Sequence, residues 1–228
     1  TDYAPYLTKV KASGAEVIFT GDWLPDAGNL LKQARQMGIT IPFANVYVDE
    51  PNYLNETGIE GTKGLTNISA YYDSTPFFKT KEHIKFYTTW KDQQKKWKTM
   101  PYSSIAFQHF TANAAAWTMT TYWLMSVVER AQSTDPEKII KVWENDSFEY
   151  VNGKVVRMRA CDHKAIMDLG VTEYVPPDQQ KVAMNIPPYY WFKNASYTGP
   201  VYKIPAEKVL PQMDQKLDRC TGKNDWGK

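Results

Sequence analysis

Apolar and polar residues follow two different spacings over the first 70 residues. Apolar side chains recur every three or four positions between Asp2 and Gly14 and again between Pro25 and Gly38, a spacing typical of amphipathic helices. Asp2 and Pro25 suit the starts of these helices, and the two glycines suit their ends. Three short apolar runs have the composition of buried strands: Ala15–Phe19, Ile39–Ala44 and Gly64–Tyr71. The order helix, strand, helix, strand predicts an α/β domain with a parallel sheet.

The pattern changes after residue 72. Seven lysines within Lys79–Lys98 accompany an apolar stripe and interspersed acidic residues, which favours the solvated face of a long helix over a basic binding patch. Two more helices are predicted, one over Ser103–Gln132 and one that begins at the capping residue Asp135. Strands are expected near Val155–Ala160 and Val171–Val175. The remaining chain holds seven prolines and many aromatic residues, which predicts an extended arm packed over a scaffold.

Composition and charge exclude several classes of partner. The 228 residues are 43% hydrophobic, enough to form a sizeable core, and 27 Lys and Arg against 25 Asp and Glu give a net charge of only +2. This balance provides no strong field for nucleic acid or anionic lipid, so we expect no nucleic-acid partner. The weakly charged stretch Ser103–Val128 contains several polar residues, which favours a buried helix of a globular domain over a membrane span.

Two cysteines, Cys161 and Cys220, have neither CxxC nor Cys/His metal spacing. They permit one disulfide in an oxidising compartment, and the alternative is two buried thiols. The sequence Cys161-Asp162-His163 could also serve a Cys/His hydrolase, although neighbours on a strand point to opposite faces. No nucleotide-binding, hydrolase or metalloprotease motif is present, and the three histidines lie far apart, so we expect neither a metal nor another cofactor.

Two loops at the carboxyl ends of predicted strands combine aromatic and acidic residues. They are Gly21-Asp22-Trp23 and the loop from Tyr47 through Asp49 to Glu50. In parallel α/β sheets, small molecules bind in the crevice outside these strand ends. Trp23 could instead pack against the neighbouring helix while Asp22 caps that helix.

Several runs of the chain resemble the type I periplasmic solute-binding proteins, in the branched-chain amino-acid (Leu/Ile/Val) receptor group of ABC transporters. The runs, which together extend from about Asp2 to Val175, are AEVIFTGDWLPDAGNLLKQARQMGITIPF, EGTKGL, SSIAFQHFTANAAAWTM, DPEKIIKVWEN and GKVVRMRACDHKAIMDLGV. The resemblance implies a two-lobed α/β fold with parallel sheets flanked by helices. It also implies a small-molecule solute that is delivered to an ABC-transporter permease.

The resemblance also implies site residues and a division of the chain. The aromatic residue after the strand-end glycine corresponds to Trp23, next to Asp22, and further ligand contacts correspond to Tyr47, Asp49 and Phe107 or His109. Tyr47 stands where amino-acid receptors place a carboxylate, which makes an aromatic acid or an amide as reasonable a solute as an amino acid. Residues 1–72 would belong to the second lobe, residues 73–170 to the first lobe, and residues 171–228 to a return strand and the arm.

The amino-terminal portion of that fold has no counterpart among these residues, so we expect it to be a necessary partner. The predicted function is that of a non-enzymatic, periplasmic or lipid-anchored extracytoplasmic solute receptor that acts as a monomer. Two alternatives stay open. One is a ligand-sensing ectodomain of the same fold, which the sequons at Asn55, Asn67, Asn145 and Asn194 would allow. The other is the Cys/His hydrolase, which requires a free thiol at Cys161.

Overall fold

The computed structural model describes residues 1–23, 25–46, 51–69, 112–149, 155–179, 197–210 and 219–220, together with residues 81, 85, 89 and 194. Of the helix predicted over Lys79–Lys98, three positions are therefore described, and all three are helical: Lys81, Lys85 and Thr89. The remainder of that segment, the first part of the predicted helix Ser103–Gln132 and most of the arm lie outside the described residues.

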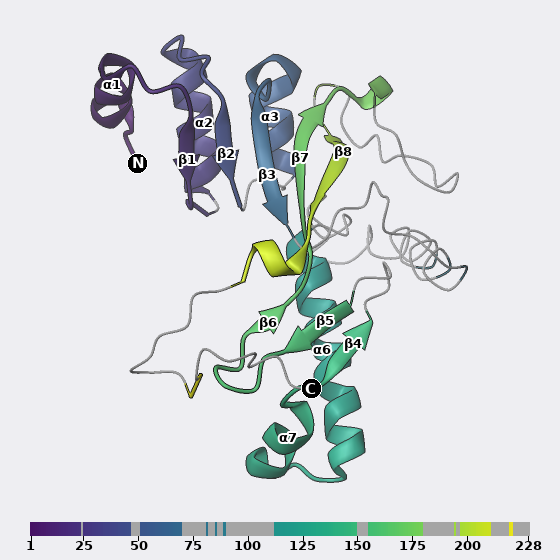
Figure 1. Cartoon of the computed structure of the whole chain (residues 1–228). Coiled ribbons are helices and arrows are strands. Elements are labelled where there is room, and N and C mark those ends of the chain that lie inside the picture. Colours follow the sequence, from purple (N-terminus) through teal and green to yellow (C-terminus); the bar gives the residue numbers. More distant parts are fainter. Residues whose placement is uncertain are drawn as a thin grey trace.

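The upper part of the molecule in Figure 1 is a five-stranded mixed sheet. Its strands, in spatial order, are β1 (Ile18–Thr20), β2 (Phe43–Asn45), β3 (Leu65–Ser69), β7 (Leu169–Val175) and β8 (Tyr197–Ile204). The first three strands are parallel, whereas β7 and β8 run antiparallel to their neighbours. The helices α1 (Ala4–Ser13), α2 (Asp26–Gln36) and α3 (Pro51–Gly61) cover one face of the sheet. The predicted αβαβ order is confirmed for this region.

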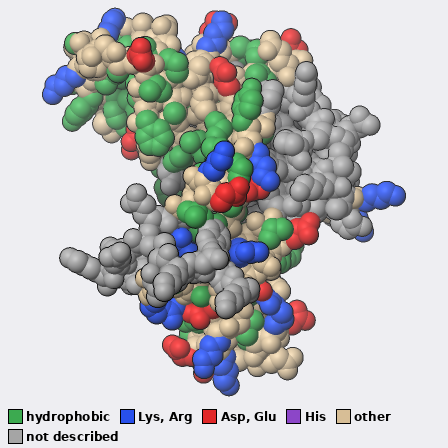
Figure 2. Space-filling view, in the orientation of Figure 1, with side chains coloured by type: hydrophobic (Ala, Val, Ile, Leu, Met, Phe, Trp, Pro, Cys, Tyr) green, Lys and Arg blue, Asp and Glu red, His purple; other side chains and the backbone are tan. Residues whose placement is uncertain are grey.

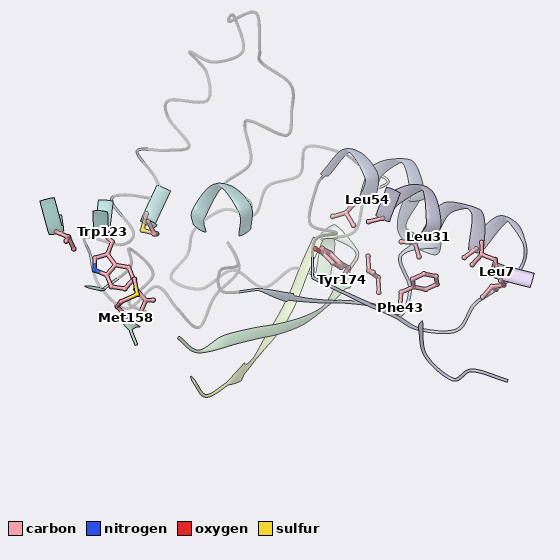
Figure 3. Close-up of a cluster of buried hydrophobic side chains, with 14 residues drawn as sticks. Leu7, Leu31, Phe43, Leu54, Trp123, Met158 and Tyr174 are labelled. Carbon is pink, nitrogen blue, oxygen red and sulfur yellow. The ribbon is translucent and has the colours of Figure 1, made fainter. Parts of the chain in front are cut away.

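The core of this unit lies between the sheet and those helices, as Figure 3 shows. Leu7 of α1, Leu31 of α2 and Leu54 of α3 are each at most 5% exposed, and they lie over Phe43 and Tyr174 of the sheet. The helical spacing of the apolar residues thus corresponds to a real buried face. This packing fixes the sheet, and with it the positions of the strand ends.

The helix ends follow from local backbone chemistry. Gly14 and Gly38 adopt φ values of 73° and 70°, so both predicted helix stops are confirmed in the left-handed region that glycine tolerates best. The prediction that Asp2 is the N-cap of the first helix is wrong by one position, because Tyr3 occupies that position. Asp2 instead accepts a hydrogen bond from the backbone N–H of Ala4 at 3.0 Å.

The predicted strands are shifted or shortened relative to the observed ones. β1 begins at Ile18 rather than Ala15, and β2 begins at Phe43 rather than Ile39. One reason is Arg35, whose guanidinium donates to the carbonyl oxygens of Ile39 and Ile41 at 2.7 and 3.1 Å. Those carbonyls are thereby paired with a side chain instead of a neighbouring strand.

The lower unit in Figure 1 combines two helices with a small antiparallel sheet. Its elements are α6 (Ala112–Ala131), α7 (Pro136–Trp143), β4 (Ser147–Glu149), β5 (Val155–Met158) and β6 (Ala165–Ile166). The predicted cap is confirmed, since the Asp135 carboxylate accepts a hydrogen bond from the N–H of Glu137 at 2.9 Å. Two short 3₁₀ helices, Pro177–Gln179 and Ala206–Lys208, belong to the carboxyl-terminal third of the chain.

One face of α6 forms the core of this lower unit. Met119, Trp123 and Val127 lie four residues apart and are at most 1% exposed. The indole of Trp123 meets the ring of Trp143 edge-on at 5.4 Å and donates a hydrogen bond to Asp146 at 2.7 Å. Within the described part of the chain, neither α6 nor any other helix combines the length and the hydropathy needed to cross a bilayer.

Candidate functional site

The carboxyl ends of the three parallel strands lie together at one edge of the upper sheet. Figure 1 shows β1, β2 and β3 all pointing toward the unit that contains α6. Loops that follow strand ends of this kind converge on the edge of the sheet, where α/β proteins bind small molecules. The geometry therefore puts the candidate site between the sheet edge and the lower unit.

A row of polar side chains crosses the sheet near this edge. Thr20 pairs in register with Asn45, Asn45 with Asn67, and Asn67 with Thr172, so the row extends over β1, β2, β3 and β7. Asn45, Asn67 and Thr172 are at most 1% exposed. Two positions nearer the start of the strands, on the same face, the row is apolar and consists of Ile18, Phe43 and Leu65. The sheet thus changes from apolar to polar as it approaches the site.

Asn45 connects two strand ends through its side-chain amide. Its Nδ2 atom lies 2.6 Å from the hydroxyl oxygen of Thr20, 3.3 Å from the carbonyl oxygen of Thr20 and 3.4 Å from that of Asp22. Donation from one buried amide to three acceptors ties the loop after β1 to the end of β2.

Backbone carbonyls of the first predicted site loop are held by hydrogen bonds. The carbonyl of Asp22 is held by Asn45, and the carbonyl of Trp23 accepts a hydrogen bond at 2.8 Å from the N–H of Ala27 in α2. The N-cap of α2 is Pro25 without a side-chain cap, so Asp22 does not cap that helix. The Asp22 side chain is half-buried, and Trp23 is 60% exposed rather than packed in the core.

The other predicted ligand contacts are Tyr47, Asp49, Phe107 and His109, and they lie outside the described residues. Sequence reasoning missed Asn45, because the predicted second strand ends at Ala44. The available signal was a polar residue directly after an apolar run, at the same register as Thr20. Asn67 was noticed only as a possible glycosylation site, whereas the structure buries it on β3.

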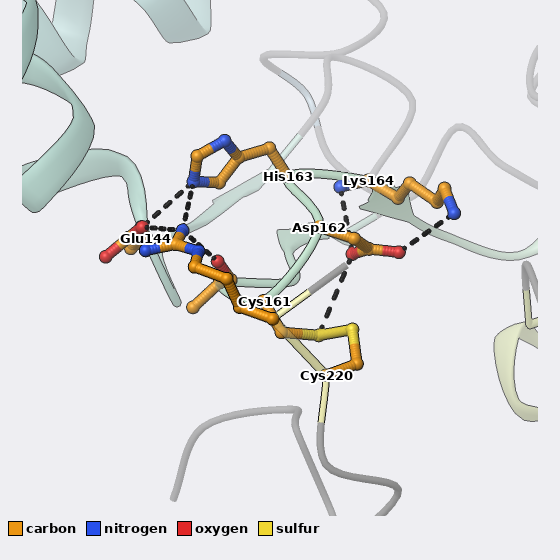
Figure 4. Close-up of polar contacts among 8 residues, drawn as sticks. Glu144, Cys161, Asp162, His163, Lys164 and Cys220 are labelled. Carbon is orange, nitrogen blue, oxygen red and sulfur yellow. Dashed lines mark hydrogen bonds and ion pairs between the residues drawn. A yellow bond between two sulfur atoms is a disulfide. The ribbon is translucent and has the colours of Figure 1, made fainter. Parts of the chain in front are cut away.

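Cys161 and Cys220 form the disulfide that the sequence permits (Figure 4). Cys161 and Asp162 lie in a turn after β5, so the expectation that they extend from opposite faces of a strand is wrong. The disulfide leaves neither cysteine of the chain as a free thiol. A hydrolase that uses Cys161 as its nucleophile is therefore contradicted, since its sulfur is already bonded. Both sulfurs lie close to the Asp162 carboxylate, but sulfur in a disulfide is not a thiolate ligand for a metal.

The turn around the disulfide is held by two charged clusters (Figure 4). Hydrogen bonds from Arg159, helped by Lys164, keep the pKa of Asp162 far below its usual range. A hydrogen bond with His163, together with Arg219, lowers the pKa of Glu144. Glu144 lies 2.9 Å from the His163 ring and 2.6 Å from the Arg219 guanidinium. These contacts fasten the segment around Cys220 to the lower unit.

A separate apolar groove of about 970 Å³ lies on the lower unit, away from the strand ends. It is lined by side chains of α6 and by one residue of β4: Met119, Tyr122, Leu124, Met125, Ser126, Val128, Glu129 and Phe148. Several of these residues are exposed, including Met125 at 61% and Tyr122 at 51%. The lining is mostly apolar, and only Tyr122, Ser126 and Glu129 among these eight residues carry polar side-chain groups, so the groove suits an apolar partner better than a polar solute.

The mixed α/β fold is that of the type I binding-protein class. The chain belongs to the periplasmic binding protein family, whose family model matches residues 1–180. The Leu/Ile/Val-binding protein homolog 4 of Brucella abortus (strain 2308) is 33% identical over 57 residues, which are 25% of this chain and 14% of that protein.

Two solved structures are similar in fold. One is the leucine-, isoleucine-, valine-, threonine- and alanine-binding protein of Brucella ovis in its closed conformation, with a TM-score of 0.65, 18% identity, and coverage of 92% of this chain and 48% of the other. The second is an ABC-transporter solute-binding protein of Rhodopseudomonas palustris HaA2 in complex with p-hydroxybenzoic acid, with a TM-score of 0.64, 18% identity, and coverage of 90% and 50%. The chain spans about half the length of these structures.

Proposed function

We propose that this chain is part of an extracytoplasmic solute receptor that captures a small molecule and delivers it to an ABC-transporter permease, without catalysing a reaction. The observation that carries the proposal is the fixed loop Gly21-Asp22-Trp23 at the carboxyl edge of a parallel sheet, in a chain of the periplasmic binding protein family. Relatives bind amino acids or aromatic acids, so the proposed solute is an amino acid, an amide or an aromatic acid.

Trp23 would cover or stack on the solute, and Asp22 would accept hydrogen bonds from its donors. Tyr47, Asp49, Phe107 and His109 complete the proposed ligand set. A half-buried carboxylate beside an exposed indole offers one apolar surface and one oriented acceptor, which suits a planar or aliphatic solute with an N–H or O–H group. Closure of the two lobes would desolvate the solute, and only tighter binding to the closed state can drive that closure.

The test is Trp23→Ala with L-leucine and 4-hydroxybenzoate as probe solutes in isothermal titration calorimetry. Loss of the indole should weaken binding by about fivefold, since an aromatic contact of this size is worth on the order of 1 kcal/mol. The melting temperature without solute should barely move, because Trp23 is mostly exposed. Tyr6→Ala is the control, since it removes another aromatic side chain that is 64% exposed, on α1. A large loss of stability with unchanged affinity would make Trp23 a structural residue.

The proposed receptor also needs a second half. The chain spans about half the length of its structural relatives, and α6 is apolar on the face that points away from its own core. We assign this outer face, with Trp117, Leu124 and Met125, to contact with the remaining portion of the receptor. In that assembly the receptor would act as a monomer in the periplasm or on a lipid anchor.

A ligand-sensing ectodomain of the same fold has less support from the described residues. Asn67 is fully buried on β3, so a glycan at that sequon is incompatible with the folded sheet. The sequons at Asn145 and Asn194 are exposed. The similar structure from Rhodopseudomonas palustris is a solute-binding protein of an ABC transporter, which supports the transport role.

A further inference from the structure

Asn45 is the buried group that links the candidate site to the sheet. It lies at the end of β2, is 1% exposed, and directs its amide nitrogen toward the β1 strand end. An amide nitrogen carries two hydrogens, and here both are committed to the hydroxyl and carbonyl oxygens of Thr20 and the carbonyl of Asp22.

Two hydrogen bonds hold consecutive carbonyls of the loop that Asn45 contacts. The chain leaves the sheet at Thr20 and enters α2 at Asp26. Between these points, the carbonyl of Asp22 is bonded to Asn45 and the carbonyl of Trp23 to Ala27. The bond from β2 acts on the peptide that joins Asp22 and Trp23, and the bond from α2 acts on the peptide that follows it, so both neighbouring elements restrain the loop at this point.

We infer that Asn45 is a positioning residue of the binding site: its amide holds the Asp22–Trp23 peptide in the orientation that presents both side chains to the solute. This inference rests on the proposed function for its ligand-binding consequence. That Asn45 restrains the loop follows from its hydrogen bonds alone. Asn45 does not touch the solute in this scheme, because it is buried beneath the loop.

Two substitutions separate the shape of the side chain from its donors. Asn45→Asp keeps the size but places oxygen against the carbonyls of Thr20 and Asp22, whereas Asn45→Ala removes the whole amide. Thr62→Val is the control for a merely structural effect. Thr62 is equally buried in the same unit, but its hydroxyl donates to the carbonyl oxygens of Gly58 and Ile59 at 3.0 and 3.1 Å, away from the site loop.

The first readout is ¹⁵N relaxation of the full 228-residue chain without solute. In both Asn45 variants, the order parameters of the Gly21, Asp22 and Trp23 amides should fall from about 0.85 to below about 0.6 while those of β3 stay unchanged. Thr62→Val should lower the melting temperature and leave the loop amides as they are. A loop that stays rigid in both Asn45 variants, or mobility that rises equally throughout the sheet, would overturn the inference.

The second readout is the affinity for L-leucine and 4-hydroxybenzoate. If the wild-type chain binds either probe, Asn45→Ala should weaken binding about tenfold, and Thr62→Val should leave the affinity within about twofold. Unchanged affinity in Asn45→Ala overturns the positioning role. If the wild-type chain binds neither probe, as it would if the second half of the receptor is needed for affinity, the relaxation data alone decide whether Asn45 fixes the loop.

Discussion

Asp162 is the most strongly perturbed carboxylate of the turn that holds the disulfide. It lies with Arg159 in a buried ion pair, with side chains that are 0% and 2% exposed and N–O distances of 2.8 and 2.5 Å. Asp162→Asn should lower the free energy of unfolding at pH 7 by about 3–5 kcal/mol, because it leaves the buried guanidinium without its counter-charge. Urea denaturation measures this change, and Glu56→Gln, which alters an exposed pair at 3.8 Å, should cost less than about 1 kcal/mol.

The same pair predicts a pH dependence with a definite sign. The folded-state pKa of Asp162 is lowered, so the pair stabilises the protein fully above the unfolded-state pKa, near 4, and loses this contribution as pH falls below that value. The free energy of unfolding of the wild type should therefore decrease more steeply below about pH 4 than that of Asp162→Asn. Parallel pH profiles for the two proteins would contradict the ionised pair.

At the level of single residues, the sequence could identify side chains but not their neighbours. Asp22 and Trp23 are visible as a strand-end aromatic–acidic pair. The contact between Asn45 and the end of β1 could not be predicted, because it depends on the strand register that sets Asn45 opposite Thr20, and register depends on tertiary packing. The burial of Asn67 could not be predicted either, since its Asn-Ile-Ser triplet alone suggested an exposed glycosylation site.

The segment around Cys220 is an element whose attachment can be tested directly. The disulfide joins two cysteines that are 59 positions apart in the sequence. The backbone N–H of Arg219 also donates a hydrogen bond to the carbonyl oxygen of Cys161 at 3.0 Å. Reduction should lower the free energy of unfolding by about 4 kcal/mol, because a loop of this length restricts the unfolded chain substantially. The measurement is urea denaturation with and without reductant.

The control for that experiment is the double variant Cys161→Ser/Cys220→Ser. It should have the stability of the reduced wild type and should not respond to reductant. A wild type that titrates with two thiols after unfolding without reductant would show that the bond is absent in solution.

Among the elements, helices were predicted better than strands. The stops at Gly14 and Gly38 and the cap at Asp135 depend on one or two residues of local sequence, so they are readable without a fold. The starts of β1 and β2 depend on which carbonyls a neighbouring strand, or the guanidinium of Arg35, takes as partners. The antiparallel addition of β8 to the sheet also depends on contacts far away in sequence, and the prediction of an extended arm did not include it.

At the scale of the whole molecule, two apolar surfaces have no covering layer among the described residues. On the upper unit, hydrophobic side chains gather over β1 and β2 in Figure 2, and Val17 and Phe19 are 56% and 68% exposed. A parallel sheet is normally covered on both faces. On the lower unit, α6 is buried on one side and apolar on the other. These surfaces fit a chain that spans about half of each similar solved structure.

The outer face of α6 gives a prediction about the whole molecule. The double substitution Leu124→Glu/Met125→Glu should change the free energy of unfolding by less than about 1 kcal/mol, since both side chains are exposed, at 39% and 61%. It should also reduce binding of the dye bis-ANS and any self-association seen by light scattering, because it removes an exposed apolar patch.

Val127→Glu, on the opposite face of the same helix, is the matched control. That valine is 0% exposed, so an unpaired carboxylate there should destabilise the lower unit severely. If the outer-face double variant unfolded as readily as Val127→Glu, both faces of α6 would already be buried within this chain, and no surface would remain for the proposed second half. If instead the double variant stays folded and loses its dye binding, α6 is a helix built to lie between two layers, one of which this chain supplies.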